Sequence, residues 1–151
     1  MGQQLFAVVL TSFILVLFLN IRRVPAVDVG VVDGAVVVTL RGWDVLYCCR
    51  RRVAVPLDAV AGVCVSRRDL VPAEGMRLPG TSIRGVIRAG SYGTGAARDF
   101  WDVRKADEVL VIQMKPECAD YRRIVLEVAE PRAEALRLRP MLGAAPLPIS
   151  A

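Results

Sequence analysis

The feature that most constrains this chain is an uncharged apolar run close to its amino terminus. Residues 5–21 (LFAVVLTSFILVLFLNI) have Thr11, Ser12 and Asn20 as their polar side chains. As a helix the run would be about 25 Å long, near the thickness of the hydrocarbon core of a bilayer. A helix packed on a soluble core would also show a polar face, and this run shows none. We therefore expect one transmembrane anchor, with its basic flank, over residues 1–23.

A buried core helix and a cleaved signal peptide are the alternatives to an anchor. A signal peptide should begin with a basic segment and end on small residues before its cleavage site. Residues 1–4 have no basic side chain, however, and the apolar run is followed by Arg22 and Arg23. Gly2 does not predict N-myristoylation, because Phe6 occupies the position at which that motif requires Ser or Thr. A retained anchor is thus the favoured interpretation.

The membrane-flanking arginines also predict an orientation. Arg22 and Arg23 lie on the carboxyl side of the run, and no Lys or Arg precedes it. Because cytoplasmic flanks are enriched in these residues, the positive-inside bias places residues 22–151 in the cytoplasm. An exported domain is the alternative.

The composition excludes several kinds of chemistry. None of the 151 residues is His, so the chain alone cannot build a Ser-His-Asp triad, a Cys-His pair or a His-ligated metal site. Its four cysteines contain no C-x-x-C spacing, and the adjacent Cys48 and Cys49 would point to opposite faces of a strand. A four-thiolate zinc site would need both of them with Cys64 and Cys118. We expect buried structural thiols instead, with no metal and no cofactor.

The rest of the chain is predicted to form short strands followed by one helix. Two Val-rich runs flank Asp33-Gly34, which is the strongest short signal for a β-hairpin. A turn at Arg41–Asp44 should precede a third strand at 45–49, and the run 123–129 alternates as a half-buried antiparallel strand does. Other strands are expected at 53–55, 63–65, 98–103 and 109–114, with bends and short strands in the Gly- and Pro-rich middle at 72–98.

A single soluble helix is expected over residues 132–139. Pro131 suits its first position, and Pro140 should end it. Within this segment Glu134 and Arg137 are spaced to form an i, i+3 ion pair. The helix would therefore cover one end of the β domain that precedes it.

These elements predict a fold in three parts. The anchor at 1–23 precedes a β domain at 24–139, and a Pro- and Ala-rich tail at 140–151 should be flexible. About seven antiparallel strands with an apolar inner face and one terminal helix favour a capped roll or a partly open barrel. The predicted fold class is therefore mainly β, preceded by one transmembrane helix.

The Gly-rich middle of the chain also contains a family motif. Residues 77–90 (RLPGTSIRGVIRAG) resemble the R-x-x-G-T-x-x-x-G pattern, followed by a further Gly, of the bacterial pleckstrin-homology-like family. An aromatic strand and an apolar strand follow that pattern in the family, and Phe100-Trp101 and residues 109–112 occupy those places here. Residues 55–63 resemble the segment with which the family begins a strand. The resemblance covers about residues 27–139.

The resemblance implies two curved antiparallel sheets closed at one end by the helix, and a non-enzymatic role that is often exercised beside a membrane helix. Together with the anchor, it predicts a single-pass protein of the bacterial plasma membrane. Its cytoplasmic domain would bind or scaffold an unidentified protein partner at the bilayer. Nucleic acid is not an expected partner, because 20 basic residues against 15 acidic ones are a modest excess.

An anionic-lipid headgroup is the alternative ligand. Arg41 and the run Arg50–Arg52 flank one predicted hairpin, with Trp43 at its tip. Basic residues around the first hairpin hold the headgroup in pleckstrin-homology domains that bind phosphoinositides, so the resemblance implies lipid contacts for Arg41, Trp43, Arg50, Arg51 and Arg52. Each basic side chain near an anionic leaflet is worth about 1 kcal/mol. A solvated charged face without a ligand is the other interpretation of this cluster.

An enzyme of unknown type is the remaining, less favoured alternative. Its acid–base candidates are two carboxylate pairs, Asp99 with Asp102 and Asp107 with Glu108. Such a pair acts where shared burial separates the two pKa values, and the second pair is expected in a solvated turn. The glycines at 90, 93 and 95 lack the order of residues found in a phosphate-binding loop. No catalytic residue is therefore assigned.

Overall fold

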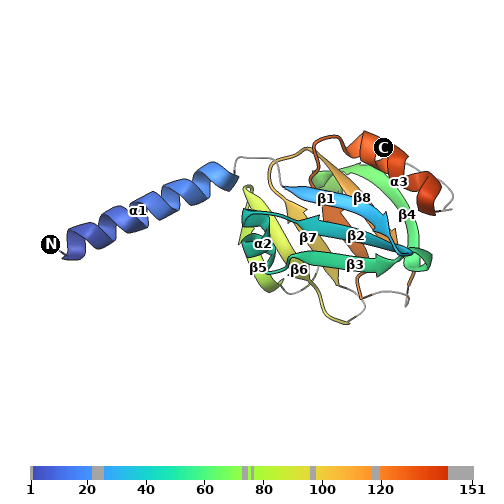
Figure 1. The fold of residues 1–151 in the computed structure, drawn as a ribbon, viewed down its shortest axis with the longest axis horizontal. Helices are drawn as coiled ribbons and strands as arrows, with labels where there is room; N and C mark the ends of the chain where they lie inside the picture. The colour runs from blue at the N-terminus through green and yellow to red at the C-terminus, as the bar shows by residue number, and fades with distance from the viewer. Residues whose placement is uncertain are drawn as a thin grey trace.

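The structure, a computed structural model, describes residues 2–21, 26–72, 75, 77–95, 98–116 and 120–142. A long helix, α1 (Gly2–Ile21), extends away from a β-rich body (Figure 1). Large apolar side chains of α1, among them Phe6 and Leu15, are exposed. The residues outside the described ranges include the predicted membrane flank Arg22 and Arg23, the thiol of Cys118 and the predicted tail beyond residue 142.

The predicted anchor coincides with α1, whose 20 residues include no Asp, Glu, Lys or Arg. Judged on the part of the chain that the structure describes, however, no helix is long and apolar enough to cross a membrane. The transmembrane anchor is therefore not confirmed and stays a prediction.

The body of the molecule consists of two β-sheets. The first has the strand order β1-β2-β3, and the second has the order β4-β8-β9-β7-β6-β5. A mainly β fold is thus confirmed, with nine strands in the described ranges instead of about seven, and these strands do not close into a barrel. The strands are β1 (Val27–Val32), β2 (Ala35–Leu40), β3 (Arg52–Pro56), β4 (Val60–Arg67), β5 (Arg77–Ile83), β6 (Ile87–Tyr92), β7 (Asp99–Val103), β8 (Glu108–Met114) and β9 (Arg123–Leu126).

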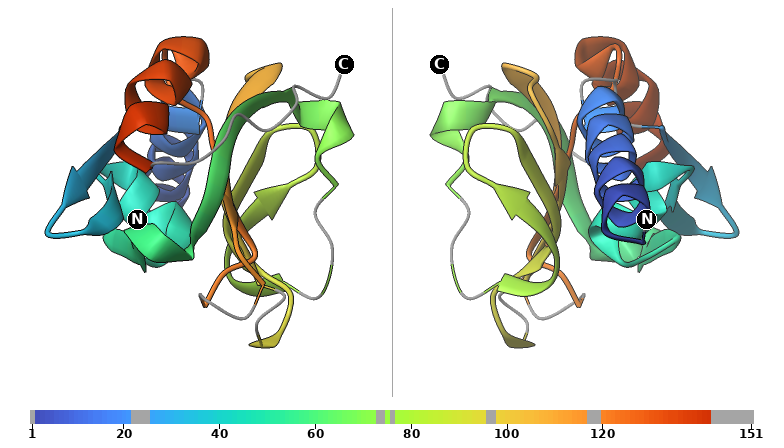
Figure 2. Two further views of the ribbon diagram at one scale, coloured as in Figure 1. Left: turned by 90° about the vertical axis from the view of Figure 1, so that its right-hand side faces the viewer. Right: turned by 90° about the vertical axis from the view of Figure 1, so that its left-hand side faces the viewer.

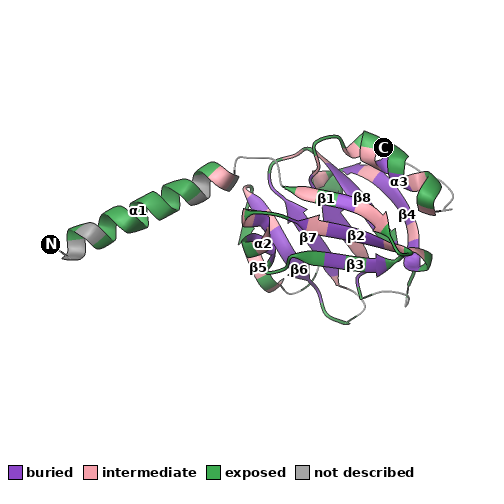
Figure 3. Cartoon of the chain, viewed as in Figure 1, coloured by how far each residue is buried: buried purple, intermediate pink, exposed green. Residues whose placement is uncertain are grey.

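The two sheets stack around a shared core, which Figure 2 shows edge-on and Figure 3 shows by burial. Val38, Phe100 and Ile124 are fully buried in it. Helix α3 (Pro131–Leu142) contacts β1 and β4, the first strand of each sheet, and so covers one open side of the stack. Helix α2 (Trp43–Cys48) contacts β5 and β6 at the other edge of the larger sheet. The expected C-terminal capping helix is therefore present, and α2 closes the opposite side.

Glycine permits the backbone geometry at two places. The predicted hairpin at Asp33-Gly34 is confirmed, and both residues adopt the positive φ that a type I′ turn requires. The motif glycines Gly80 and Gly90 are paired between β5 and β6. A Cβ added to Gly80 would lie 2.4 Å from the carbonyl oxygen of Ala89, so a side chain there would force the two strands apart.

The strand predicted at 45–49 is wrong, because this segment forms α2. Gly42 before it and Cys49 after it have φ values of 57° and 54°, which interrupt an extended backbone at both ends. Tyr47 and Cys48 are buried in the core. Burial of this short helix therefore outweighs the strand propensity of its sequence.

The strand predicted at 123–129 also differs from the expectation of a half-buried antiparallel strand. It ends at Leu126, and it pairs antiparallel with β8 but parallel with β7. Both faces are buried, because Val125 packs in a second cluster with Trp101 and Val71. The expectation of purely antiparallel sheets is therefore wrong at the β7–β9 pair.

Helix α3 continues through Pro140, where it was expected to end, and finishes at Leu142. The N–H that proline lacks would have bonded the carbonyl of Leu136, and this residue is exposed, so that water can replace the bond. The predicted ion pair between Glu134 and Arg137 is confirmed at 2.6 Å.

Candidate functional site

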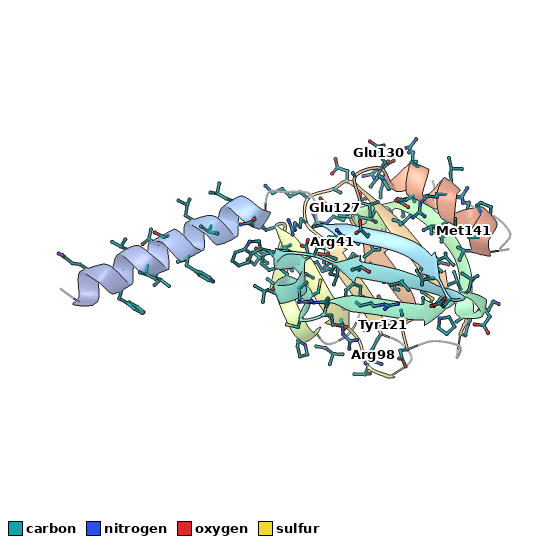
Figure 4. All side chains as sticks on the ribbon, viewed as in Figure 1. Arg41, Arg98, Tyr121, Glu127, Glu130 and Met141 are labelled. Atoms are coloured by element: carbon teal, nitrogen blue, oxygen red, sulfur yellow. The ribbon has the colours of Figure 1, made fainter. Side chains whose placement is uncertain are left out.

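The structure brings together only part of the predicted lipid-contact cluster. Arg41 and Arg51 line one open hollow of about 560 Å³ together with Leu46. Arg50 extends elsewhere, with its guanidinium carbon 5.9 Å from the ring centre of Tyr121. In Figure 4, Tyr121 lies at the lower edge of the domain, away from Arg41. The two arginines of the hollow therefore do not share one ligand position with Arg50.

Trp43 has a structural position instead of a place at a hairpin tip. Its ring centre lies 6.4 Å from that of Tyr47, in α2, and 6.4 Å from that of Phe13, in α1. The charge of Arg41 is partly neutralised by Asp28, 2.5 Å away. Arg52 begins β3 and is exposed. Trp43 thus contacts α1, and Arg51 and Arg52 are the arginines of the predicted cluster with freely exposed charge.

A buried ion pair joins the end of α1 to the domain. Arg104 donates from Nη1 to the carbonyl oxygen of Asn20 at 2.7 Å and from Nη2 to Oδ1 of Asp44. The other carboxylate oxygen of Asp44 accepts from the backbone N–H of Ala26 at 2.7 Å. The side chains of Arg104 and Asp44 are only 3% and 2% exposed. This arrangement, named here the α1 junction, fixes the last turn of α1 against the first residues of the domain.

A second carboxylate holds the loop that presents Arg104. Oε2 of Glu127 accepts from the consecutive backbone N–H groups of Arg104, Lys105 and Ala106 at 2.6, 2.9 and 3.1 Å. Consecutive N–H groups that converge in this way form a concave anion-binding site. Glu127, whose position is labelled in Figure 4, occupies that site through these three hydrogen bonds, so the N–H groups are not available to an external anion.

Asp102 is a buried carboxyl group beside this cluster. Neither of its oxygens makes a hydrogen bond of good geometry within the described residues. Burial raises its pKa well above the usual range, the neighbouring Asp44 raises the pKa further, and Arg104 opposes this effect. Burial likewise raises the pKa of the adjacent Cys48 thiol, with Asp102 adding to the shift. The protonated forms of both groups are therefore favoured.

Neither of the two candidate carboxylate pairs forms a closely coupled, buried pair in the structure. Asp99 and Asp102 are three residues apart on β7 and so point to opposite faces of the sheet. Asp99 is instead paired with Arg122 at 2.9 Å and Arg123 at 2.8 Å. Asp107 is exposed, as expected of a solvated turn. Its neighbour Glu108 is bound by Arg132 at 2.6 Å, which lowers the pKa of that carboxyl.

The cysteines divide into buried and exposed thiols. Cys48 and Cys64 are buried, as predicted, and burial raises the pKa of the Cys64 thiol. The prediction is wrong for Cys49, which follows the last residue of α2 and is exposed. Within the described ranges, no three Cys, Asp or Glu side chains are grouped in a way that could hold a metal ion.

Comparisons of the chain with protein-family models, with curated proteins and with solved structures give no match. The resemblance to the pleckstrin-homology-like family therefore stays a prediction that rests on the residues themselves.

Sequence reasoning missed the α1 junction and the role of Glu127. Arg104 and Asp44 are 60 residues apart in the chain, and Glu127 is 23 residues from Arg104. No local spacing signals such contacts. One feature of the sequence hinted at the α1 junction. Arg104 directly follows a strand, β7, whose side chains alternate toward two buried faces of the sheet.

Proposed function

We propose that this chain is a membrane-attached, non-catalytic binding or scaffolding module with a pleckstrin-homology-like domain. The observation that supports membrane attachment is the surface of α1, which has no charged residue. Its apolar side chains are exposed at successive turns, with exposed fractions of 70% for Phe6, 55% for Phe13 and 56% for Leu19. An apolar surface of this extent is unfavourable in water and suited to hydrocarbon.

The α1 junction supports a mechanical connection between anchor and domain. Because Arg104 binds the carbonyl oxygen of Asn20, the last turn of α1 is attached to the loop between β7 and β8. Two buried charges form this attachment, so the loss of either one is expected to be costly. A bilayer that holds α1 would therefore also hold the domain close to its surface.

The arrangement of the carboxylates supports a non-catalytic role. Both oxygens of Asp99 are bound by arginines, and Glu127 is bound by three backbone N–H groups. Asp102 is fully buried and lines none of the described hollows. A general acid or base must reach its substrate, and these three groups are engaged or enclosed.

Two stacked sheets with a C-terminal helix favour the pleckstrin-homology-like roll, and the parallel β7–β9 pair departs from it. In this proposal the domain lies at the cytoplasmic face of a bacterial plasma membrane. There it binds or scaffolds a protein component.

Membrane attachment is tested by washing membranes that contain the full chain with alkaline carbonate. We expect the wild-type chain to stay in the membrane pellet. The double variant Val9→Arg, Leu15→Arg should leave it, since each arginine costs about 2.5–3.5 kcal/mol at the centre of a membrane helix. The matched control is Val9→Leu, Leu15→Ile. Release of the wild-type chain by carbonate would contradict the proposal.

Orientation is tested with the exposed thiol of Cys49. A membrane-impermeant maleimide should label it after lysis and leave it unlabelled in intact cells. Cys48 and Cys64 are buried in the fold. The variant Cys49→Ser identifies the signal that belongs to this residue, because any labelling that remains in it comes from the other cysteines. Labelling of Cys49 in intact cells would favour the exported alternative.

A further inference from the structure

The starting observation is an uneven distribution of partners among the basic side chains. Most described Lys and Arg side chains have a carboxylate, carbonyl or aromatic partner within the chain. Four described basic side chains have none of these partners: Arg51, Arg52, Arg84 and Lys105. Their charges are therefore available to an external group.

Strand register brings these four residues to the end of the domain where α1 is attached. Val103, the last residue of β7, precedes Arg104 of the α1 junction and pairs with Arg88 of β6. Ile83 pairs with Ile87, so the β5–β6 turn that contains Arg84 lies beside this position. Lys105 follows Arg104 directly in the chain.

Arg52, the first residue of β3, and Arg51 before it lie at the same end of the smaller sheet. The carbonyl oxygen of Arg51 accepts from Leu40 at 2.9 Å, and that of Ala26 accepts from Arg41 at 2.9 Å. Ala26 in turn donates to Asp44 of the α1 junction. The preceding helix, α2, packs against β5 and β6. The four unpaired cations therefore gather around the end of α1.

Exposed apolar side chains accompany them. Leu46 of α2 is 64% exposed, and Ile83 at the end of β5 is 42% exposed. Asp107 is an exposed acid in the same loop as Lys105, and Asp28 is already paired with Arg41. Basic charge therefore exceeds acidic charge on this surface, which we name the α1-proximal end (Leu46, Arg51, Arg52, Ile83, Arg84 and Lys105).

We infer that the α1-proximal end lies on an anionic bilayer surface, with its four cations at the lipid phosphates and Leu46 and Ile83 at the depth of the headgroups. The inference rests on the proposed function, because α1 must first hold the chain in a membrane. It revises the predicted cluster: Arg51 and Arg52 remain, Arg84 and Lys105 join, and Arg50 and Trp43 contact the protein itself.

The charge and the position of the α1-proximal end indicate which partner it binds. A surface next to an embedded helix meets lipid headgroups before any soluble molecule. Basic residues close to an anionic leaflet are attracted within about one Debye length, and each contributes about a fivefold preference. The exposed apolar side chains can make the same contacts with a zwitterionic bilayer surface, so they add no preference for anionic lipid. The preference between lipid compositions therefore measures the contribution of the cations.

The test is hydrogen–deuterium exchange of the full chain in two kinds of nanodisc, one of phosphatidylcholine and one of equal parts phosphatidylcholine and phosphatidylglycerol. We expect slower exchange for residues 45–52 and 83–87 in the anionic discs, with unchanged exchange at the distant turn Asp33-Gly34. Raised salt should remove the difference.

Matched variants assign the effect to the unpaired cations. Arg51→Gln, Arg84→Gln should weaken the protection by about fivefold for each arginine removed. The control double variant Arg98→Gln, Lys115→Gln removes the same amount of charge from the far ends of β7 and β8. It should leave the protection from exchange unchanged. Equal exchange in both kinds of disc, or equal effects of the two double variants, would overturn the inference. Failure of the proposed function is distinct, because the wild-type chain would then be released by carbonate.

Discussion

Asp99 and Asp102 are the same residue type on the same strand, both fully buried, and they have opposite surroundings. Asp99 faces the side where Arg122 and Arg123 bind its two oxygens. Asp102 faces the side that holds Asp44, Glu127 and Arg104: burial raises its pKa, the two acids add to the shift, and Arg104 opposes it. The face of the strand therefore decides which groups surround each of these buried carboxyl groups.

Substitution of Asp99 should have the largest effect. Asp99→Asn keeps the size of the side chain but leaves Arg123, which is 16% exposed, without its counter-ion. We expect a loss of about 3 kcal/mol in the free energy of unfolding, measured by urea denaturation of the full chain in detergent. Asp120→Asn, at an 88% exposed side chain, is the control. A loss within the error of that control would mean that the two faces do not differ as described.

Asp102 should make stability depend on pH with an unusual sign. An acid whose pKa is raised by folding binds more protons in the folded state, so the free energy of unfolding falls as pH rises. The fall begins near the ordinary pKa of Asp, about 3.9, and continues to the folded pKa. Its slope is at most about 1.4 kcal/mol per pH unit. Asp102→Asn should remove this contribution, whereas Asp107→Asn should keep it. An unchanged slope in Asp102→Asn would contradict the raised pKa.

Removal of the charge of Glu127, which acts on Asp102, tests the comparison of the two aspartates further. Glu127→Gln keeps an oxygen acceptor but weakens three charge-assisted hydrogen bonds, so we expect a loss of about 1–2 kcal/mol. The same change should lower the pKa of Asp102, because Glu127 is one of the groups that raise it. Urea denaturation over a pH series reports both effects. If the pH dependence stays the same, Glu127 does not act on Asp102.

The smallest effect is expected at an exposed ion pair. Glu134→Gln breaks the i, i+3 contact with Arg137, whose side chain is 42% exposed. Such pairs contribute about 0.3 kcal/mol. Thermal melts of the wild-type chain and the variant should show a smaller difference in stability in high salt than in low salt. A loss comparable to that of Asp99→Asn would show that exposure is not the deciding factor.

The sequence predicted the elements whose signals are local. The Asp33-Gly34 turn, the Val-rich strands and the terminal helix each depend on residues a few positions apart, and all are present. The segment 45–49 was misassigned, because its strand propensity was outweighed by the burial of α2 and by left-handed residues at each end. The parallel pairing of β7 with β9 depends on tertiary contacts that no local pattern indicates.

For the candidate site, the sequence identified arginines but not their partners. It grouped Arg50 with Arg51 because they are adjacent, whereas Arg50 contacts Tyr121. It could not indicate Arg84 and Lys105, since their place beside α1 follows from strand register. Unpaired charge is a property of the folded chain, because it depends on which acids lie nearby.

The contact between Arg104 and Asn20 has a mechanical consequence. A flexible tether would transmit only tension. The carbonyl of Asn20, in the last turn of α1, is instead hydrogen-bonded to Arg104 at the end of a central strand, so α1 behaves as a lever arm. Tilting α1 would apply a torque to the β7–β8 loop, and through Glu127 to the end of β9. In the proposed membrane-attached state, a change in bilayer thickness that alters the tilt of α1 would thus act on the larger sheet.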